Sequence, residues 1–241
     1  MIAVLSVEAR KLNRSLASLL ALAAPTLIAI FLFFNMLRGE KPPSWEMLLQ
    51  GSMAIWAFFM LPMSVTALTA LVAHMEHGPR AWDHLRALPI ARWKLYAAKA
   101  ICVILMVAAM SLLNLALSLG AIATVVAIKP VLAPTGALDI AAQVATVGKV
   151  MLAAILLIAI QLWTALRYSS FVPALALGIG GTFFSVVATS AKQGVFFPWQ
   201  MPINVLAGEA WRVNTALALG GGVGTVVLLL AIAHLARREV L

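Results

Sequence analysis

Long apolar runs, separated by short stretches that carry most of the charge, make up most of the 241-residue chain. An α-helix rises 1.5 Å per residue, so about 20 apolar residues cross the ~30 Å hydrocarbon core of a bilayer. The runs that reach this length, or come close to it, cover residues 16–37, 51–73, 100–128, 147–166, 171–190 and 216–235. The pattern predicts an all-α polytopic membrane protein, with six transmembrane helices in a single permease-sized domain over residues 1–241.

Two further segments predict helices that do not cross the membrane. In residues 2–14, apolar and charged positions alternate with helical spacing, which is typical of an amphipathic helix at the membrane surface. Residues 192–212 are rich in aromatic side chains but interrupted by Pro198, Pro202 and Gly208. This composition predicts a re-entrant or interfacial segment on the outer side, before the last span.

Charge predicts the orientation. The net charge is +9, but the basic residues are scattered between apolar runs rather than gathered on one face, which argues against nucleic acid as a partner. With both termini in the cytoplasm, eleven of the 17 Lys and Arg residues lie inside and six outside, as the positive-inside rule prefers. The lone Cys102 allows no intramolecular disulfide.

The chain is poor in residues that could form a catalytic site. Its two aspartates, Asp83 and Asp139, fall on opposite sides of the predicted membrane, and it has no serine-hydrolase elbow, zinc-protease motif or phosphate-binding loop. No predicted span carries an acid in its middle, which disfavours the alternative of an ion-coupled secondary transporter or an intramembrane enzyme. We therefore expect a protein that is not an enzyme and holds no cofactor of its own.

Three sets of polar or small residues allow two interpretations each. His74, His77 and His84 with Glu76 could bind a metal, but their spacing matches no standard ligand pattern, so we expect a polar turn and no metal. The mid-span amides of Asn114 and Gln161 could line a substrate path or form hydrogen bonds between helices. The glycines within residues 220–224 predict close helix packing, because no phosphate-loop lysine follows them.

The charged segment of residues 74–99 lies between the second and third predicted spans. Pro79 suits the first turn of a short amphipathic helix, and Pro89 would end it. A basic stretch then leads into the third span, where Arg92, Tyr96 and Lys99 are expected to anchor the helix at the membrane interface. On these physical grounds alone, a connector lying on the membrane surface is an equally good interpretation.

The segment resembles a known family. Its run E-H-G-x-x-x-W-x-x-L-x-x-L-P-I-x-R-x-x-L-Y-x-A-K is similar to the first cytoplasmic loop of type-2 ABC transporter permeases, especially the small lantibiotic-immunity and bacitracin-resistance group. The N-terminal E-A-R-K-L-N-R-S, Trp45, Trp56 and Pro62 are similar to that group as well.

The resemblance implies the permease subunit of an ABC exporter in the bacterial plasma membrane, with a peptide-like or amphipathic substrate such as an antimicrobial. It implies a cytoplasmic ATPase dimer as partner, which binds the ATP and Mg²⁺, and a second identical or related permease within the lipid. It further implies a coupling helix that contacts the ATPase. The residues that would make or shape this contact are Glu76, Gly78, Trp82, Leu85, Leu88 and Pro89. A scaffold that binds an ATPase without transport is the alternative.

Overall fold

The structure is a computed structural model, which describes residues 1–13, 15–77, 90–189 and 191–237. The described chain is helical throughout, without strands. The first half contains α1 (Ile2–Leu12), α2 (Leu16–Leu37), α3 (Trp45–Ile55), η1 (Trp56–Met60), α4 (Leu61–His77), α6 (Arg92–Ile128) and η2 (Pro130–Leu132). The second half contains α7 (Ile140–Ala153), α8 (Ile155–Arg167), α9 (Val172–Ala188), η3 (Lys192–Phe196), α10 (Met201–Asn204), α11 (Ala210–Leu217), η4 (Ala218–Val223) and α12 (Gly224–Arg237).

Four continuous helices are long and apolar enough to cross a membrane. They are Leu16–Leu37, Trp45–His77, Arg92–Ile128 and Ala210–Arg237. The pair α7 and α8, bent by 43° at its break, could supply a fifth. Helix α9 has 17 residues, which span about 25 Å and fall short of the ~30 Å hydrocarbon core. The described residues therefore form a multi-pass membrane protein with four to five candidate spans rather than six clear ones.

Several helices extend beyond the predicted apolar runs. The second predicted span, residues 51–73, lies in a helical stretch that begins at Trp45 and ends at His77, and the third begins at Arg92 rather than at residue 100. Hydropathy marks where lipid can cover a helix, whereas the backbone stays helical wherever its N–H groups continue to bond the carbonyls four residues earlier, whether the side chains are apolar or polar. The fourth predicted span is not a single helix, because it contains the break at Ala154.

Two π-helical turns interrupt the long helices. The turn η1 ends two residues before Pro62, which lacks an N–H and whose ring crowds the carbonyl of Phe58 within that turn, so a widened turn here has a clear cause. The turn η4 and the first residue of α12 contain the glycines expected to pack closely. A Cβ on Gly220 would collide with the backbone of Ala153, and one on Gly224 with Leu156, which confirms the predicted packing role for these two positions.

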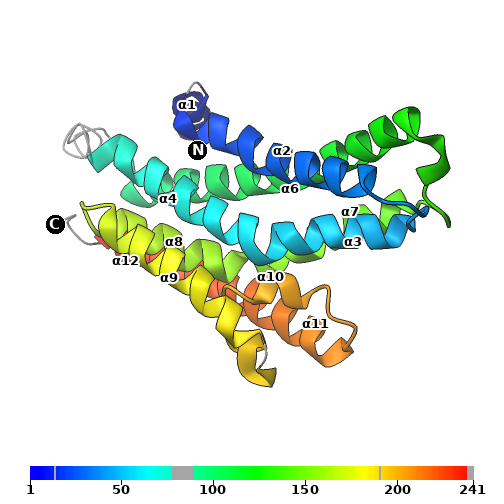
Figure 1. Ribbon diagram of the computed structural model, residues 1–241. Helices are drawn as coiled ribbons and strands as arrows, with labels where there is room; N and C mark the ends of the chain where they lie inside the picture. The colour runs from blue at the N-terminus through cyan, green and yellow to red at the C-terminus, as the bar shows by residue number, and fades with distance from the viewer. Residues whose placement is uncertain (14, 78–89, 190, 238–241) are drawn as a thin grey trace.

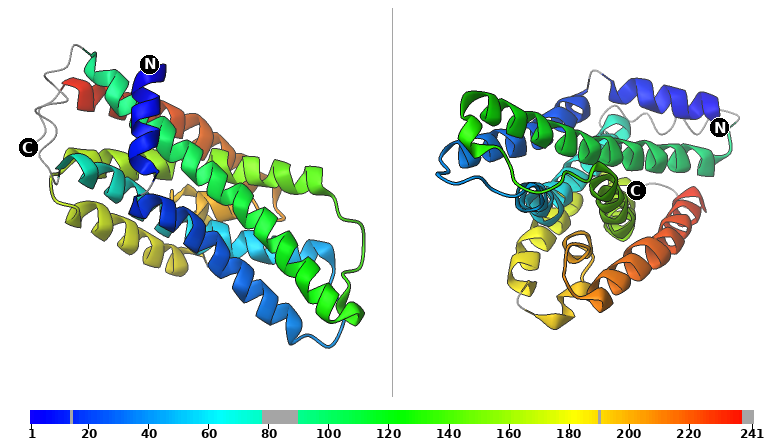
Figure 2. Two further views of the ribbon diagram at one scale, coloured as in Figure 1. Left: turned by 90° about the horizontal axis from the view of Figure 1, so that it is seen from above. Right: turned by 90° about the vertical axis from the view of Figure 1, so that its right-hand side faces the viewer.

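The elements meet at two ends of the bundle (Figures 1 and 2). One end, here called the α1 end, carries α1, the end of α4, the start of α6, the turn between α8 and α9, and the end of α12. The opposite end carries the start of α3, the loop between α6 and α7, and the short helices η3, α10 and α11. There, Thr135 donates its backbone N–H to Pro43, and Trp45 donates to Thr135, which joins the two loops.

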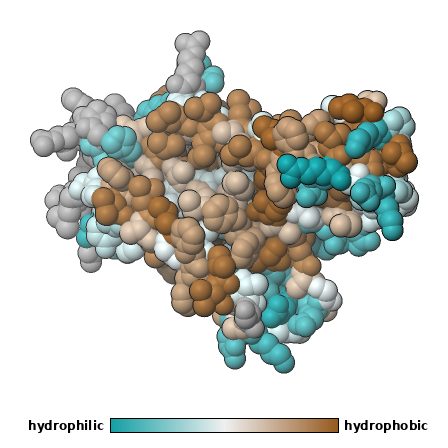
Figure 3. Space-filling view, viewed as in Figure 1, coloured by the Kyte–Doolittle hydropathy of each residue, from teal (hydrophilic) through white to brown (hydrophobic). Residues whose placement is uncertain are grey.

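The surface matches a membrane environment. Figure 3 shows apolar residues across the middle of the bundle and hydrophilic residues toward its two ends. Large apolar side chains of α2, such as Leu22, Phe31 and Phe34, are more than half exposed. A soluble protein rarely exposes so much contiguous apolar surface, whereas a lipid-facing helix requires it.

Candidate functional site

Four charged side chains from three helices form a buried ring at the α1 end. The Lys99 ammonium donates hydrogen bonds to Glu8 Oε2 and to Glu76 Oε1, each at 2.7 Å. The Lys11 ammonium donates to the same Glu76 oxygen at 2.7 Å and to Glu8 Oε1 at 3.1 Å. We call these four residues the ion cluster. Each of its carboxylates contacts both of its ammonium groups.

Three of the four members of the ion cluster are almost completely removed from solvent, and the fourth is partly buried. Lys99 is 1% exposed, Glu76 2% and Glu8 5%, while the Lys11 side chain is 31% exposed. Two acids and two bases give no net charge, and buried charges are tolerated only when they are paired and hydrogen-bonded in this way. Removing one partner from such a group typically costs about 3–5 kcal/mol, because another buried charge loses its compensation.

Local structure brings the four residues together. Glu8 and Lys11 are three residues apart on α1 and therefore lie on the same face. Helix α1 ends at Leu12, and Ser15 caps the start of α2 by accepting a hydrogen bond from the Ala17 N–H, which makes the junction short. Glu76 lies in the last turn of α4, and Lys99 lies two turns into α6. The ion cluster thus joins α1 to both helices that flank residues 78–89.

The ion cluster also holds Lys11 in its charged form. Burial lowers the pKa of the Lys11 ammonium, but the hydrogen bond to Glu76 and the attraction of Glu8 outweigh this effect, so the pKa is raised above 10.5. Lys11 therefore remains protonated at neutral pH.

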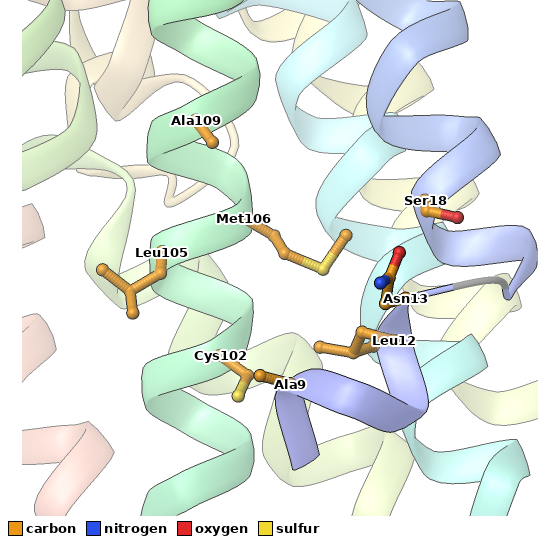
Figure 4. A pocket seen from close by; sticks show the side chains of 8 residues that line it. All are labelled: Ala9, Leu12, Asn13, Ser18, Cys102, Leu105, Met106 and Ala109. Carbon is orange, nitrogen blue, oxygen red and sulfur yellow. The ribbon is translucent and has the colours of Figure 1, made fainter. Parts of the chain in front are cut away.

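An apolar pocket of about 320 Å³ lies beside the ion cluster, between α1, α2 and α6 (Figure 4). Ala9, which follows Glu8, and Cys102, one helical turn after Lys99, both line it. Cys102 is the only cysteine of the chain and is 5% exposed. Its position between α1 and α6 makes the thiol a natural reporter of whether α1 is docked.

The residues expected to contact an ATPase fall in two groups. Gly78, Trp82, Leu85, Leu88 and Pro89 lie outside the described residues. Glu76 is described, and its carboxylate points into the ion cluster, where it accepts hydrogen bonds from Lys11 and Lys99. Any influence of Glu76 on a partner is therefore exerted through the helices that it holds.

The three expected interface anchors have different surroundings. Arg92 is exposed at the first turn of α6, as a group reaching toward headgroups would be. Tyr96 is 3% exposed and Lys99 only 1%, so both pack inside the protein. The Lys99 ammonium finds carboxylate partners within the bundle, which differs from a lysine that extends its charge to the membrane surface.

The two mid-span amides are bonded between helices. Asn114 is 1% exposed and donates to Ser52 Oγ at 3.3 Å, and the Ser52 and Ser118 hydroxyls lie 2.7 Å apart. Gln161 is fully buried, and with its amide oriented to suit its neighbours it donates to the Ala174 carbonyl and accepts from the Gly178 N–H. These bonds confirm the interhelical interpretation, while a substrate path along these residues stays a prediction.

Within the described ranges, no three His, Cys, Asp or Glu side chains are grouped so that they could hold a metal ion. His84, one of the three clustered histidines of the sequence, falls outside these ranges.

Sequence reasoning missed Glu8 and Lys11 as members of the ion cluster. Both are among the charged positions of the predicted surface helix over residues 2–14, and helical spacing shows that they share a face but not what that face contacts. The available signal was a pair of opposite charges in the N-terminal helix and a second pair at the two ends of the charged segment, Glu76 and Lys99.

The structure, a bundle of long helices with four to five candidate spans, defines a multi-pass membrane protein. The family model described as "ABC-2 family transporter protein" matches residues 4–185, so the chain belongs to that family. Membership of this family supports a role as the permease component of an ABC transporter and implies association with an ABC ATPase. A search of curated proteins and a search of solved structures found no match.

Proposed function

We propose that this chain is the transmembrane subunit of an ABC exporter, in which residues 78–89 contact the ATPase and the ion cluster couples that contact to α1. The family match supports the permease role. The observation that carries the coupling role is the ion cluster, because it joins both helices flanking residues 78–89 to the N-terminal helix.

The ion cluster suits the transmission of force. When ATP binding closes the ATPase dimer, the segment between α4 and α6 is displaced, and buried ion pairs make α1, α4 and α6 move together at this end. A ring of four mutually compensated charges resists partial opening, since the loss of one contact leaves a buried charge under-compensated. This arrangement favours two discrete states over gradual deformation.

In this proposal Glu76 is a positioning residue, and the ATPase contact is made or shaped by Gly78, Trp82, Leu85, Leu88 and Pro89. The ATPase subunits bind ATP and Mg²⁺, while this chain performs no catalysis and carries no metal or cofactor. Support comes from the absence of nucleotide-binding and catalytic motifs in the full sequence.

The proposed topology has six spans, with the bent pair α7 and α8 as the fourth and the short α9 as the fifth. The α1 end then faces the cytoplasm of a bacterial cell, and both termini lie on the cytoplasmic side of the plasma membrane. Helix α1 lies at the membrane interface, and residues 192–212 form the re-entrant outer segment. The excess of basic residues on this side supports the orientation. The gathering of α1, the end of α4, the α8–α9 turn and the end of α12 at one end agrees with it.

A substrate path needs a wider wall than one such chain offers, so we propose a dimer of this permease or a pair with a related one. The substrate class that we propose is a peptide-like or amphipathic molecule, such as an antimicrobial exported for self-immunity or resistance. Its support is the resemblance of the segment Glu76–Lys99 to the small permeases of that function.

The experiment is copurification of the tagged chain with its coexpressed ATPase subunit, followed by ATP hydrolysis measurements on the complex. We expect Trp82→Ala with Leu85→Ala to reduce ATPase retention severalfold. Trp211→Ala serves as the control, because Trp211 is exposed at the opposite end. Unchanged retention in the double variant, at unchanged melting temperature, would show that residues 78–89 are not the contact.

A further inference from the structure

A second feature of the α1 half of the bundle is an apolar groove bounded by α8, α9 and α12. In the right-hand view of Figure 2, α8 lies between α9 and α12. The groove has a volume of about 460 Å³, within the range of small-molecule sites. Its walls include Ile160 and Trp163 from α8, Leu177 from α9, and Val227, Leu230 and His234 from α12.

His234 places a polar group at one end of this groove. The Trp163 indole N–H donates to His234 Nδ1 at 3.0 Å, and the two rings stack with centroids 5.9 Å apart. A nitrogen that accepts a hydrogen bond carries no proton, so this contact assigns the imidazole proton to Nε2. His234 therefore offers an N–H donor from a ring that Trp163 holds in a defined orientation.

Two arginines extend the polar end. Arg167 follows Trp163 by four residues on α8, and Arg237 follows His234 by three on α12, so each lies one turn closer to the α1 end on the same face. Neither arginine forms an ion pair within the described residues. The described acids at this end, Glu8 and Glu76, are both compensated inside the ion cluster.

We propose that this groove binds one anionic phospholipid of the cytoplasmic leaflet. An acyl chain would lie along the apolar walls, and the headgroup phosphate would be held by Arg167, Arg237 and the Nε2–H of His234. The order of apolar and cationic residues matches that of a lipid in this leaflet. Val227 and His234 are seven residues apart, so about 10 Å of apolar wall lies between the middle of the bundle and the cationic end. Basic pockets between membrane helices on the cytoplasmic side are suited to anionic headgroups. This inference uses the proposed orientation but not the coupling role of residues 78–89.

The test is native mass spectrometry of the delipidated full-length chain, titrated with dioleoyl phosphatidylglycerol or dioleoyl phosphatidylcholine. We expect one phosphatidylglycerol to bind each chain at least about tenfold more tightly than phosphatidylcholine, given about 1 kcal/mol for each cation near a headgroup. Arg167→Gln with Arg237→Gln should remove this preference. The control Arg38→Gln with Lys41→Gln, which removes two exposed cations at the opposite end, should retain it.

A matched pair on α12 tests the groove itself. Leu230→Trp fills it and should weaken phosphatidylglycerol binding severalfold, whereas Leu229→Trp changes a neighbouring residue of equal size and similar exposure that does not line the groove. Equal binding of the two lipids, or full retention of the preference by the double arginine variant, would overturn the proposal. So would a loss of chain dimers in Leu230→Trp at unchanged lipid binding, since the groove would then be a contact between copies.

Discussion

Replacing Lys99 by Met should release α1 from the bundle. The change removes the ammonium that compensates both Glu8 and Glu76 and leaves two buried carboxylates sharing Lys11 alone. Methionine approximates the length of the aliphatic stem of lysine, so the variant tests charge more than packing. The expected loss is about 3–5 kcal/mol, the usual cost of breaking a buried ion pair by removing one partner.

The loss of stability can be measured as an increase in the rate at which maleimide labels Cys102. Cys102 lies in the pocket between α1 and α6 and is 5% exposed, so maleimide labelling of its thiol should be slow while α1 is docked and fast once α1 moves away. If such local opening limits the reaction, a loss of about 3–5 kcal/mol raises the rate by about two to nearly four orders of magnitude. Because the chain has no other cysteine, the assay needs no background substitutions.

Two variants make the result specific. Lys94→Met removes a charge on the same helix from a residue outside the ion cluster, and labelling should stay at the wild-type rate. Adding Glu8→Gln to Lys99→Met leaves a neutral pair of Lys11 and Glu76, and should recover a large part of the protection. Wild-type labelling and melting temperature in Lys99→Met would refute the reasoning that the ion cluster docks α1.

Three further predictions concern stability and can be checked by thermal unfolding in detergent. Folding raises the pKa of Lys11, so the contribution of its charge to the free energy of unfolding is complete below the ordinary pKa of 10.5 and is lost as pH rises through the higher folded pKa. Lys11→Met should therefore flatten the decline in melting temperature at alkaline pH. Gly220→Ala should cost about 1–3 kcal/mol through collision with Ala153, whereas Gly222→Ala, which has open space, should be near neutral; equal effects would contradict the packing role. Ser111→Ala should cost about 1–3 kcal/mol, because the buried Trp56 indole N–H, which donates to Ser111 Oγ at 2.9 Å, is left without its acceptor. Adding Trp56→Phe should not double that loss.

Hydropathy and charge spacing predicted much of the architecture. The first predicted span, residues 16–37, coincides with α2, and a helix covers Ile2–Leu12 within the predicted amphipathic segment. These features are local, since a span needs a run of apolar residues and an amphipathic helix needs a period of 3.6. The same local information could not show the bend at Ala154 or the early end of α9 at Ala188, where packing and backbone conformation decide.

The candidate site was predicted in part. The segment of residues 74–99 stands out because charge is excluded from hydrocarbon, and its likeness to a permease loop agrees with the family match over residues 4–185. The pairing of Lys99 with Glu8 could not be predicted, since 91 residues separate them and no sequence period connects them. Likewise, the Trp163 and His234 contact joins two helices whose neighbourhood no local pattern defines.

By itself the sequence determined that the chain is a multi-pass membrane protein, and it predicted that the charged segment of residues 74–99 is excluded from the hydrocarbon. The physical reason is that the cost of placing a charge in hydrocarbon depends on the residue and its near neighbours. Only the tertiary structure decided that Glu8, Lys11, Glu76 and Lys99 compensate one another, because ion pairing depends on distances of about 3 Å between atoms from different helices. Those distances exist only once the helices have packed.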